Sequence, residues 1–327
     1  MESICERHQK NKYEAAVREC VEIVCEMYQE TEYEAALKEG VEGKSARDVL
    51  GKGYHFGLIK LDIRTKSRTA VEFNIGGVMN LKTKNVVGNL ETKYRFKEYG
   101  IRFSEKWNTD NVLSTEIALE DFCKGAKLSC ETSFSPKGPR PPDLSPNEKW
   151  TFGDKALRLK GDFRNAISAV NLESEFRAGG PLVRAGVVMG YSGCLVGCTT
   201  AYDTIRKAFK DTKVAMGFMS KDFTLHTSVT NGEVFGGSVH HATSASLETG
   251  LEVSWTANGK SNFAIGCRYS VGSEVVLRVK VDNFPYLSFG YSHKLKEGIN
   301  ISVSTQLNGR DYLNGSHNVG FLIELEA

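Results

Sequence analysis

Between about Phe56 and Ala327 the sequence alternates apolar and polar residues with a period of two, in segment after segment. Successive side chains of a β-strand point to opposite faces, so each such segment predicts a strand with one apolar face and one polar face. The clearest instance is 299–307, and others fall at 101–107, 223–229, 263–271 and 277–281. In the clearest instance the apolar face would carry Ile299, Ile301, Val303 and Leu307, and the polar face Asn300, Ser302, Ser304 and Gln306.

So many amphipathic strands, with little helical pattern among them, predict one large antiparallel sheet. If its apolar face meets lipid, the sheet must close on itself, because an open edge would leave unpaired backbone groups in hydrocarbon. We therefore expect an all-β fold, a transmembrane antiparallel β-barrel whose polar interior encloses an aqueous passage, with an N-terminal helical segment. The alternative is a soluble sandwich whose apolar faces pack on one another, and extraction without detergent would favour it.

The composition is compatible with a barrel. Hydrophobic residues make up 40% of the chain, and no run of about 18 apolar residues offers a transmembrane helix. A barrel strand needs apolar residues only at alternate positions, so such a run is not expected. No proline precedes Pro136, and five lie between Pro136 and Pro146. They predict one exposed loop there, because proline cannot join a central ladder.

Charge is distributed unevenly, although the net formal charge is only +2. Residues 1–42 contain 5 Lys/Arg and 11 Asp/Glu, whereas the rest of the chain contains 37 Lys/Arg and 29 Asp/Glu. An acidic arm of charge −6 thus precedes a body of charge +8. A basic pore would concentrate anions, and an acidic arm inside it would oppose that effect.

Residues 1–42 predict an acidic helical extension with an internal repeat. The string Tyr13-Glu14-Ala15-Ala16 returns 20 residues later as Tyr33-Glu34-Ala35-Ala36. Apolar residues recur at intervals of three and four in the first copy, as on one face of a helix. The arm is either a duplicated helical unit or a solvated charged helix without a partner. Residues 43–53 then predict a short helix and hinge, and residues 54–327 the barrel.

Several strings from Gly43 onward resemble the mitochondrial voltage-dependent anion channels, the eukaryotic porins. They follow the family's order and comprise 43–49, 52–54, 58–62, 90–94, 235–238 and the highly specific Glu105-Lys106-Trp107-Asn108-Thr109-Asp110-Asn111. The resemblance implies a barrel of about 19 strands, a count known for this family. It further implies an outer mitochondrial membrane pore for anions and small metabolites such as nucleotides and phosphate, gated by voltage, with a helix in the lumen. The runner-up is a weakly conducting or altered-selectivity paralogue that serves as a membrane scaffold or binds partners.

The chain departs from the family pattern in ways that indicate a divergent paralogue. The acidic arm replaces a short leader. His55 stands in the glycine-rich hinge where the family usually has another glycine, and Cys194 stands where it usually has tryptophan. The resemblance nevertheless leaves Gly51, Gly53 and Gly57 as the expected hinge glycines.

Glu105 is the predicted gating and self-association residue. It shares the parity of Phe103 and Trp107, so we expect it to face lipid, where a carboxylate is costly and therefore a functional candidate. The resemblance implies a membrane-facing glutamate at this position with those roles. The alternative is an interfacial residue with little function.

A set of basic residues is predicted to line the lumen and contact anions or nucleotides. The set comprises Lys52, Lys60, Lys93, Arg95, Lys127, Arg268, Arg278 and Lys280. Lys52 precedes the predicted strands, and the other seven occupy polar positions of the alternating pattern. As a set they would attract anions, whereas singly each is an ordinary solvated wall residue. Gly125-Ala126-Lys127 resembles a Gly-Leu-Lys string that the family links to nucleotide contact, and no phosphate-binding loop accompanies it.

We find no basis for enzymatic chemistry, a cofactor or a metal site. The eight cysteines form no CxxC pair, so free thiols are favoured over a disulfide or a weak metal site at Cys194 and Cys198. His226 is expected on the polar face of a strand, and His240 and His241 on a turn. The predicted partners are the lipid bilayer, small anions and metabolites, and a second copy of the chain, but not nucleic acid.

Overall fold

The computed structural model describes residues 43–68, 71–96, 98–123, 125–135, 155–165, 167–177, 180–257, 259, 261–283, 286–310 and 317–327. The predicted acidic extension at 1–42 and the loop from Pro136 to Pro146 lie outside the described residues. The described residues contain a helix, α3 (Lys44–Gly51), followed by strands only.

These strands form one sheet of 19 members. In chain order they are β1 (Leu58–Lys66), β2 (Val71–Asn80), β3 (Val86–Phe96), β4 (Ile101–Asn108), β5 (Leu113–Cys123), β6 (Ala126–Phe134), β7 (Lys155–Arg164), β8 (Ser168–Arg177), β9 (Gly180–Tyr191), β10 (Cys194–Asp203), β11 (Ala208–Met219), β12 (Phe223–Thr230), β13 (Val234–Ala242), β14 (Leu247–Thr256), β15 (Ser261–Val271), β16 (Val275–Asp282), β17 (Tyr286–Lys296), β18 (Ile299–Asn308) and β19 (Asn318–Glu326).

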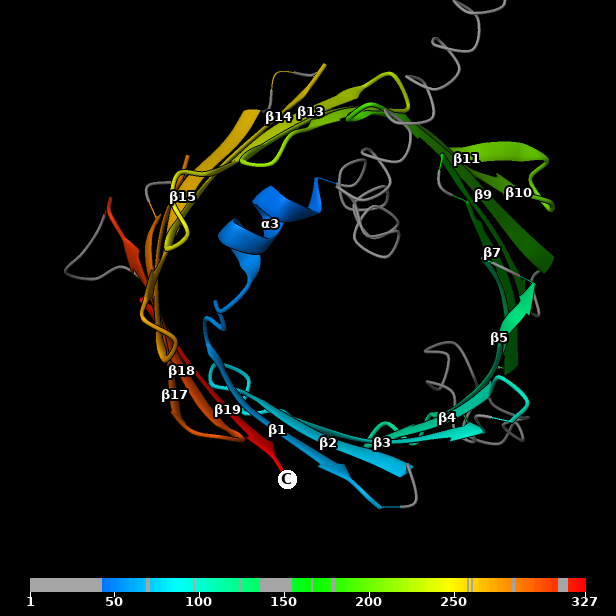
Figure 1. Ribbon diagram of the computed structural model, residues 1–327, viewed down its shortest axis with the longest axis horizontal. Coiled ribbons are helices and arrows are strands. Elements are labelled where there is room, and N and C mark those ends of the chain that lie inside the picture. Colours follow the sequence, from blue (N-terminus) through cyan, green and yellow to red (C-terminus); the bar gives the residue numbers. More distant parts are fainter. Residues whose placement is uncertain are drawn as a thin grey trace, which may run out of the picture.

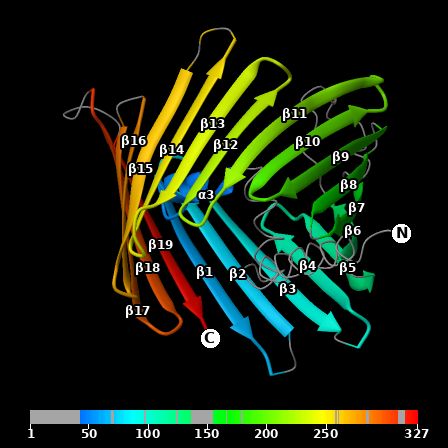
Figure 2. The ribbon, with the colours of Figure 1, turned by 45° about the horizontal axis from the view of Figure 1, so that its top comes forward.

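The sheet closes into a barrel through its first and last strands. Each strand pairs antiparallel with its neighbour in sequence, and β1 pairs parallel with β19, in register from Ile59 opposite Phe321 to Arg64 opposite Glu326. An odd number of alternating strands leaves the first and last pointing the same way, so this parallel seam is a geometric necessity. Figure 1 shows the resulting ring, and Figure 2 the slant of its strands.

The barrel turns its apolar residues outward, as the alternation predicts. Along β18, Ile301 pairs with Ile323 and Val303 with Phe321, while Ser302 and Ser304 occupy the other face. Ser302 and Ser304 are buried on the lumen side, whereas large apolar side chains such as Ile265 and Trp107 are exposed on the outside. The prediction of an all-β transmembrane barrel is therefore confirmed.

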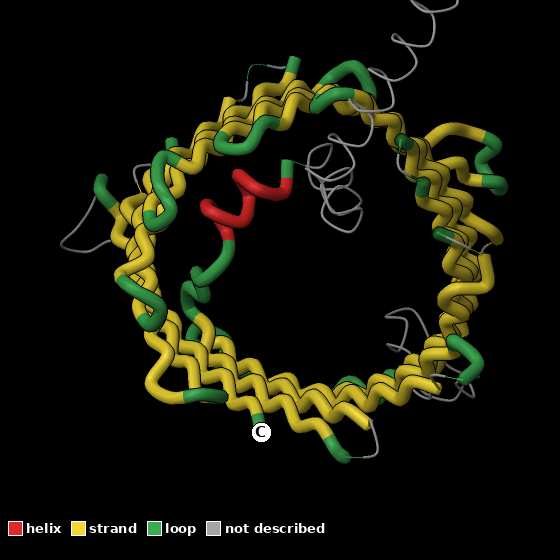
Figure 3. The backbone as a smooth tube through the Cα atoms, in the orientation of Figure 1, coloured by secondary structure: helices red, strands yellow, loops and turns green. Residues whose placement is uncertain are grey.

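Helix α3 lies inside the ring and packs on the inner wall formed by β13, β14 and β15 (Figure 3). Its apolar face is buried through Ala46, Val49 and Leu50. The wall beneath carries Gly250 and Gly266, and a Cβ on Gly250 would lie 3.3 Å from the Cβ of Val49. Glycines thus provide the space that the helix occupies. No helix among the described residues is long and apolar enough to cross a membrane.

The placement of two histidines differs from the sequence prediction. His240 and His241 were expected on a turn but lie within β13, where His240 faces the lumen beside Gly250 and His241 faces outward beside Thr249. The hairpin bend comes later than predicted. It follows Ala242 and is formed by the small polar residues from Thr243 to Ser246. His226 lies on the lumen face, where it is buried.

We predict that Gly250→Val displaces α3 from the wall. The added γ-carbons would enter the space of Val49, so the free energy of unfolding in detergent should fall by about 1–3 kcal/mol, as for overpacked cores. Gly77→Val is the matched control, because Gly77 faces outward and a Cβ there meets nothing within 4 Å. Equal losses for both variants in urea titrations would contradict the proposed packing.

Candidate functional site

The strand register points all seven predicted basic strand residues into the lumen. They share the parity of Ser302 and Ser304, opposite to that of the exposed apolar residues, and comprise Lys60, Lys93, Arg95, Lys127, Arg268, Arg278 and Lys280. The eighth, Lys52, follows the last residue of α3 and forms an ion pair with Asp48. The sequence thus placed these residues correctly, while their role in binding anions stays a prediction.

Most of these cations are paired with carboxylates, which the sequence pattern alone did not predict. Lys93 lies 3.1 Å from Glu91, whose other oxygen lies 3.1 Å from Lys106. Asn74 donates a further hydrogen bond of 3.0 Å to Glu91. Glu91 thus accepts from donors on β2, β3 and β4 and compensates the charge of two cations, one on β3 and one on β4.

Glu120, on β5, compensates charge in the same way further along the wall. Its two oxygens meet Arg95 at 3.2 Å, Arg102 at 3.1 Å and Lys127 at 3.2 Å. Glu116 lies 4.0 Å from Arg102. Two of the predicted anion contacts, Arg95 and Lys127, therefore share one carboxylate, which reduces their attraction for a mobile anion.

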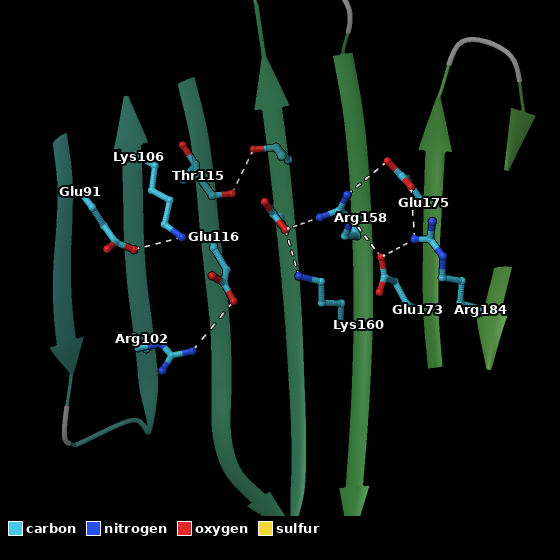
Figure 4. Close-up of polar contacts among 12 residues, drawn as sticks. Glu91, Arg102, Lys106, Thr115, Glu116, Arg158, Lys160, Glu173, Glu175 and Arg184 are labelled. Carbon is cyan, nitrogen blue, oxygen red and sulfur yellow. Dashed lines mark hydrogen bonds and ion pairs between the residues drawn. The ribbon is translucent and has the colours of Figure 1, made fainter. Parts of the chain in front are cut away.

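The network continues across β6 to β9, where Arg158 is its centre (Figure 4). Arg158 meets Glu131 and Glu173 at 3.2 Å each and Glu175 at 3.3 Å, through three different nitrogens. Lys160 also meets Glu131, and Arg184 bridges Glu173 and Glu175 from β9. A planar guanidinium with several donors suits such a three-carboxylate site better than an ammonium group would.

Parity alone would have placed these carboxylates on the lumen face, although not against particular cations. Glu91 stands two residues before Lys93, and Glu173 two before Glu175, so each pair shares a face. Knowing which cation each carboxylate meets also requires the lateral register, because the partners lie on neighbouring strands. The wall from β3 to β9 is thus a mixed-charge surface rather than a basic one.

A second group of cations lies beneath the segment that joins α3 to β1. Arg268 and Arg278 are directly opposite each other on β15 and β16, a repulsive arrangement for like charges. Glu248 relieves it by pairing with Arg268 at 3.2 Å. Arg278 donates to Ser292 Oγ at 2.8 Å, and a Cβ on Gly53 would lie 2.7 Å from its Nη1. The joining segment therefore lies directly on the Arg278 guanidinium.

A cavity of about 490 Å³ opens beside this group, between α3 and the wall of β14 to β17. Basic Arg47 and Lys280 line it together with acidic Glu252 and Asp282. Lys280 lies 3.4 Å from Asp282 and 5.5 Å from the centre of the Tyr54 ring. The cavity thus combines charged groups of both signs with apolar side chains such as Leu50 and Phe263.

The hinge glycines differ in what they do. Gly51 ends α3, whereas Gly53 and Gly57 adopt φ values of +80° and +71°, a region that side chains rarely enter. Between them, the His55 backbone N–H donates to Ser304 Oγ at 2.9 Å. A Cβ on Gly320 would lie 1.8 Å from the His55 carbonyl oxygen, so only glycine permits this approach of the hinge to β19.

Burial controls the titration of the two hinge side chains. It raises the pKa of Tyr54, which therefore remains a neutral phenol at physiological pH. Burial, followed by the positive charge of Lys60, lowers the pKa of His55 from its ordinary 6.5, so the imidazole is neutral at pH 7. Tyr54 and His55 thus add no charge to the lumen at neutral pH.

Glu105 lies on the outer face of the barrel. Its cross-strand partners are Thr92 and Thr115, which share the outward parity of Trp107. The side chain is half-buried among these neighbours. The outward position agrees with the sequence prediction. The role in gating and self-association stays a prediction.

The described cysteines are free thiols, and the described residues contain no cluster suited to a metal ion. Cys194 and Cys198 are exposed on β10 with outward parity, beside Tyr191 and Val187. Four residues of extended strand separate them by about 13 Å, too far for a disulfide.

An apolar outer surface, a closed ring and a charged lumen define a transmembrane pore-forming barrel, or porin. The profile of the family described as eukaryotic porin matches residues 42–320. The chain belongs to this family.

Its relatives include the "voltage-dependent anion-selective channel" of Drosophila melanogaster, 41% identical over 87% of this chain and 97% of that protein. The "non-selective voltage-gated ion channel VDAC1" of Homo sapiens is 38% identical over 87% of this chain and 96% of that protein. Among solved structures, a mutant porin of Rh. blastica is 10% identical, covers 83% of this chain and 95% of its own, and has a TM-score of 0.41.

We predict that Arg158→Gln destabilises the barrel more than Lys106→Gln. Loss of Arg158 removes the shared partner of three carboxylates, whereas Glu91 keeps Lys93 when Lys106 is lost. Because Arg158 is partly hydrated, we expect a loss of about 1–2 kcal/mol, between the values for exposed and buried pairs. Urea titration in detergent measures both variants, and an equal or larger loss for Lys106→Gln would contradict the central role of Arg158.

Proposed function

We propose that the protein is a voltage-dependent pore of the outer mitochondrial membrane that passes anions and small metabolites such as phosphate and nucleotides. The observation that carries the proposal is the closed barrel, apolar outside and lined by charge inside. An aqueous passage with charged walls is what conduction of hydrated ions requires. Membership of the eukaryotic porin family supports the membrane location and the voltage dependence.

The preference for anions rests on charge. Residues 43–327 carry a net charge of +8. The lumen contributes the Arg268, Arg278 and Lys280 group, in which two of the three cations have a nearby carboxylate. The mixed-charge wall of β3 to β9 is nearly compensated, so it offers little discrimination between signs. We therefore expect a weak preference for anions that salt readily screens.

The porin fold and the absence of a catalytic constellation among the described side chains support a channel rather than an enzyme. The cavity beside Lys280 is a widening of the conducting path in this proposal, where phosphate groups would meet Arg47 and Lys280. Transport needs only weak and reversible contact, because tight binding would slow exit from the pore.

Recording from planar bilayers tests the pore directly. Purified protein should produce stepwise conductance, and in a salt gradient the reversal potential should have the sign of an anion-preferring pore. Conductance should fall as the applied voltage rises in magnitude. Bilayers that stay at baseline with folded protein would refute the pore, and a reversal potential of cationic sign would refute the anion preference alone.

We further propose that Glu105 acts in self-association through the outer face of β3 to β5. A carboxylate among lipid-facing neighbours is costly in the monomer and gains from a partner surface that supplies polar groups. Its neighbours Thr92 and Thr115 offer hydroxyl groups to a second copy at the same place. The voltage-dependent closing of the pore would be coupled to the same face.

We predict that Glu105→Gln stabilises the inserted barrel by about 1 kcal/mol, since acidic residues on a barrel surface cost modestly in the membrane. The same change should lower the yield of crosslinked dimers in membranes. Glu98→Gln is the matched control, because Glu98 lies exposed in the turn between β3 and β4. Dimer yields that are identical for wild type and Glu105→Gln would leave Glu105 without a role in self-association.

A further inference from the structure

The hairpin of β10 and β11 contains a β-bulge next to its turn (Figure 2). Ala201 pairs with Asp211 and Tyr202 with Phe209, so Lys210 is an extra residue without a cross-strand partner. Asp211 has lumen parity, and Phe209 would share it if the bulge were absent. The bulge instead turns Phe209 outward, where its ring centre lies 5.3 Å from that of Tyr202. Bulges that re-aim a side chain are typical of barrel rims and of functional sites.

The aromatic pair of Tyr202 and Phe209 marks the membrane boundary on this hairpin. It is the last outward-facing pair before the turn, and Phe209 is 71% exposed. Aromatic residues near the ends of barrel strands form the girdles at the two membrane interfaces. The turn that follows, residues 204–207, therefore lies at the depth of the lipid headgroups.

Three exposed cations lie beside the aromatic pair. Arg206 and Lys207 are in the turn, and Lys210 is the bulge residue. None of the three forms an ion pair with any residue that the structure describes. The two carboxylates of the hairpin, Asp203 and Asp211, have lumen parity instead. The cations of this rim are thus unpaired, whereas most of those on the wall from β3 to β9 share carboxylates.

The turn holds its cations in a fixed place. Asp203 Oδ1 accepts hydrogen bonds from the backbone N–H of Ile205 at 3.0 Å and of Arg206 at 3.2 Å. Thr204 Oγ1 donates to the carbonyl oxygen of Pro181, on β9, at 2.6 Å. A turn that is already ordered loses little conformational freedom when it binds a ligand.

A pair of hydroxyl groups lies one row closer to the membrane centre. Thr200 and Thr212 are paired on the outer face, and their Oγ1 atoms lie 3.3 Å apart. Whichever hydroxyl donates this bond, the other keeps a hydrogen for a further acceptor. The next row, with Cys198 and Val214, is exposed and apolar. From centre to rim, the surface thus changes from apolar groups to hydroxyls, aromatic rings and cations.

This order matches a glycerophospholipid, with its acyl chains, ester groups and headgroup phosphate. We propose that the outer rim of β10 and β11 binds a phospholipid whose headgroup is a phosphate monoester. The phosphate contacts Arg206, Lys207 and Lys210, an ester carbonyl accepts from the threonine pair, and an acyl chain packs against the aromatic pair. We call this surface the β10–β11 rim site. It depends on the barrel lying in a membrane and not on conduction.

The number of cations favours a phosphate monoester over a diester. A monoester has three terminal oxygens and a charge between −1 and −2 at neutral pH, because its second pKa is near 6. A diester has a single charge, and in phosphatidylcholine a cationic group offsets it. Clusters of Lys and Arg at a membrane surface attract anionic lipids, each cation adding to the attraction.

Quenching of tryptophan fluorescence by lipids with brominated acyl chains tests the site. The reporter chain carries Phe209→Trp together with Trp107→Phe, Trp150→Phe and Trp255→Phe, which remove the native tryptophans. The reference chain keeps Trp255 alone, which is 48% exposed near the end of β14, at the same rim as the turn after β10. Both are placed in phosphatidylcholine vesicles that contain brominated phosphatidic acid, phosphatidylglycerol or phosphatidylcholine at matched mole fractions.

We expect brominated phosphatidic acid to quench the reporter as strongly as brominated phosphatidylcholine does at an at least about threefold higher mole fraction. The reference chain should respond equally to both lipids. Equal quenching of the reporter by the two lipids overturns the proposal. A preference of the same size in the reference chain also overturns it, because the attraction is then a property of the whole surface. Phosphatidylglycerol that matches phosphatidic acid overturns the assignment of a monoester.

A charge-removal variant identifies the cations that bind. Arg206→Gln, Lys207→Gln and Lys210→Gln together in the reporter chain should abolish the preference for phosphatidic acid. Quenching by brominated phosphatidylcholine should stay unchanged, which shows that the variant is inserted. Lys82→Gln with Lys84→Gln is the matched control, because both lysines are exposed in the turn between β2 and β3, and it should keep the preference. A preference that persists in the triple variant, or that the control also loses, overturns the proposal.

Discussion

The structure depends on one constraint, which is that no backbone N–H or C=O facing lipid can remain unpaired. A sheet satisfies it only by closing, and here the closing contact is the parallel seam between β1 and β19. That seam includes the pairing of Ile63 with Leu325 on the lipid face and of Asp62 with Glu324 on the lumen face. Closure sorts the side chains as well, since each residue must face either lipid or water.

Sorting by parity concentrates charge on a concave surface, where like charges would repel strongly. The wall from β3 to β9 resolves this by alternating signs between strands, so that carboxylates such as Glu91 and Glu120 each lie among several cations. Cross-strand ion pairs also bind each strand laterally to the next, beyond the backbone ladder. The charge network that lines the passage therefore contributes to the stability of the barrel that encloses it.

The alternation in the sequence predicted the faces of the strands well, because parity is a local property. It placed Lys60 and Arg278 inside and Glu105 outside without any knowledge of neighbours. It did not predict that Arg95 and Lys127 share Glu120, because that depends on register, which turns and the irregularity in β5 determine. The family resemblance, not the pattern, supplied the strand number.

Two parts of the lumen wall differ in what covers them, and the positions of the glycines account for the difference. From β13 to β19, glycines such as Gly250, Gly266 and Gly320 leave room for α3 and the hinge, so the wall there is covered by the chain itself. From β3 to β8, long charged side chains fill the same layer and face the water. An ion that passes through the lumen thus has a mixed-charge wall on one side and the surface formed by α3 and the hinge on the other. Because α3 is held by three buried apolar residues and a few hinge contacts, it is the more easily rearranged side. A change of conductance without a change of the barrel would therefore begin on that side.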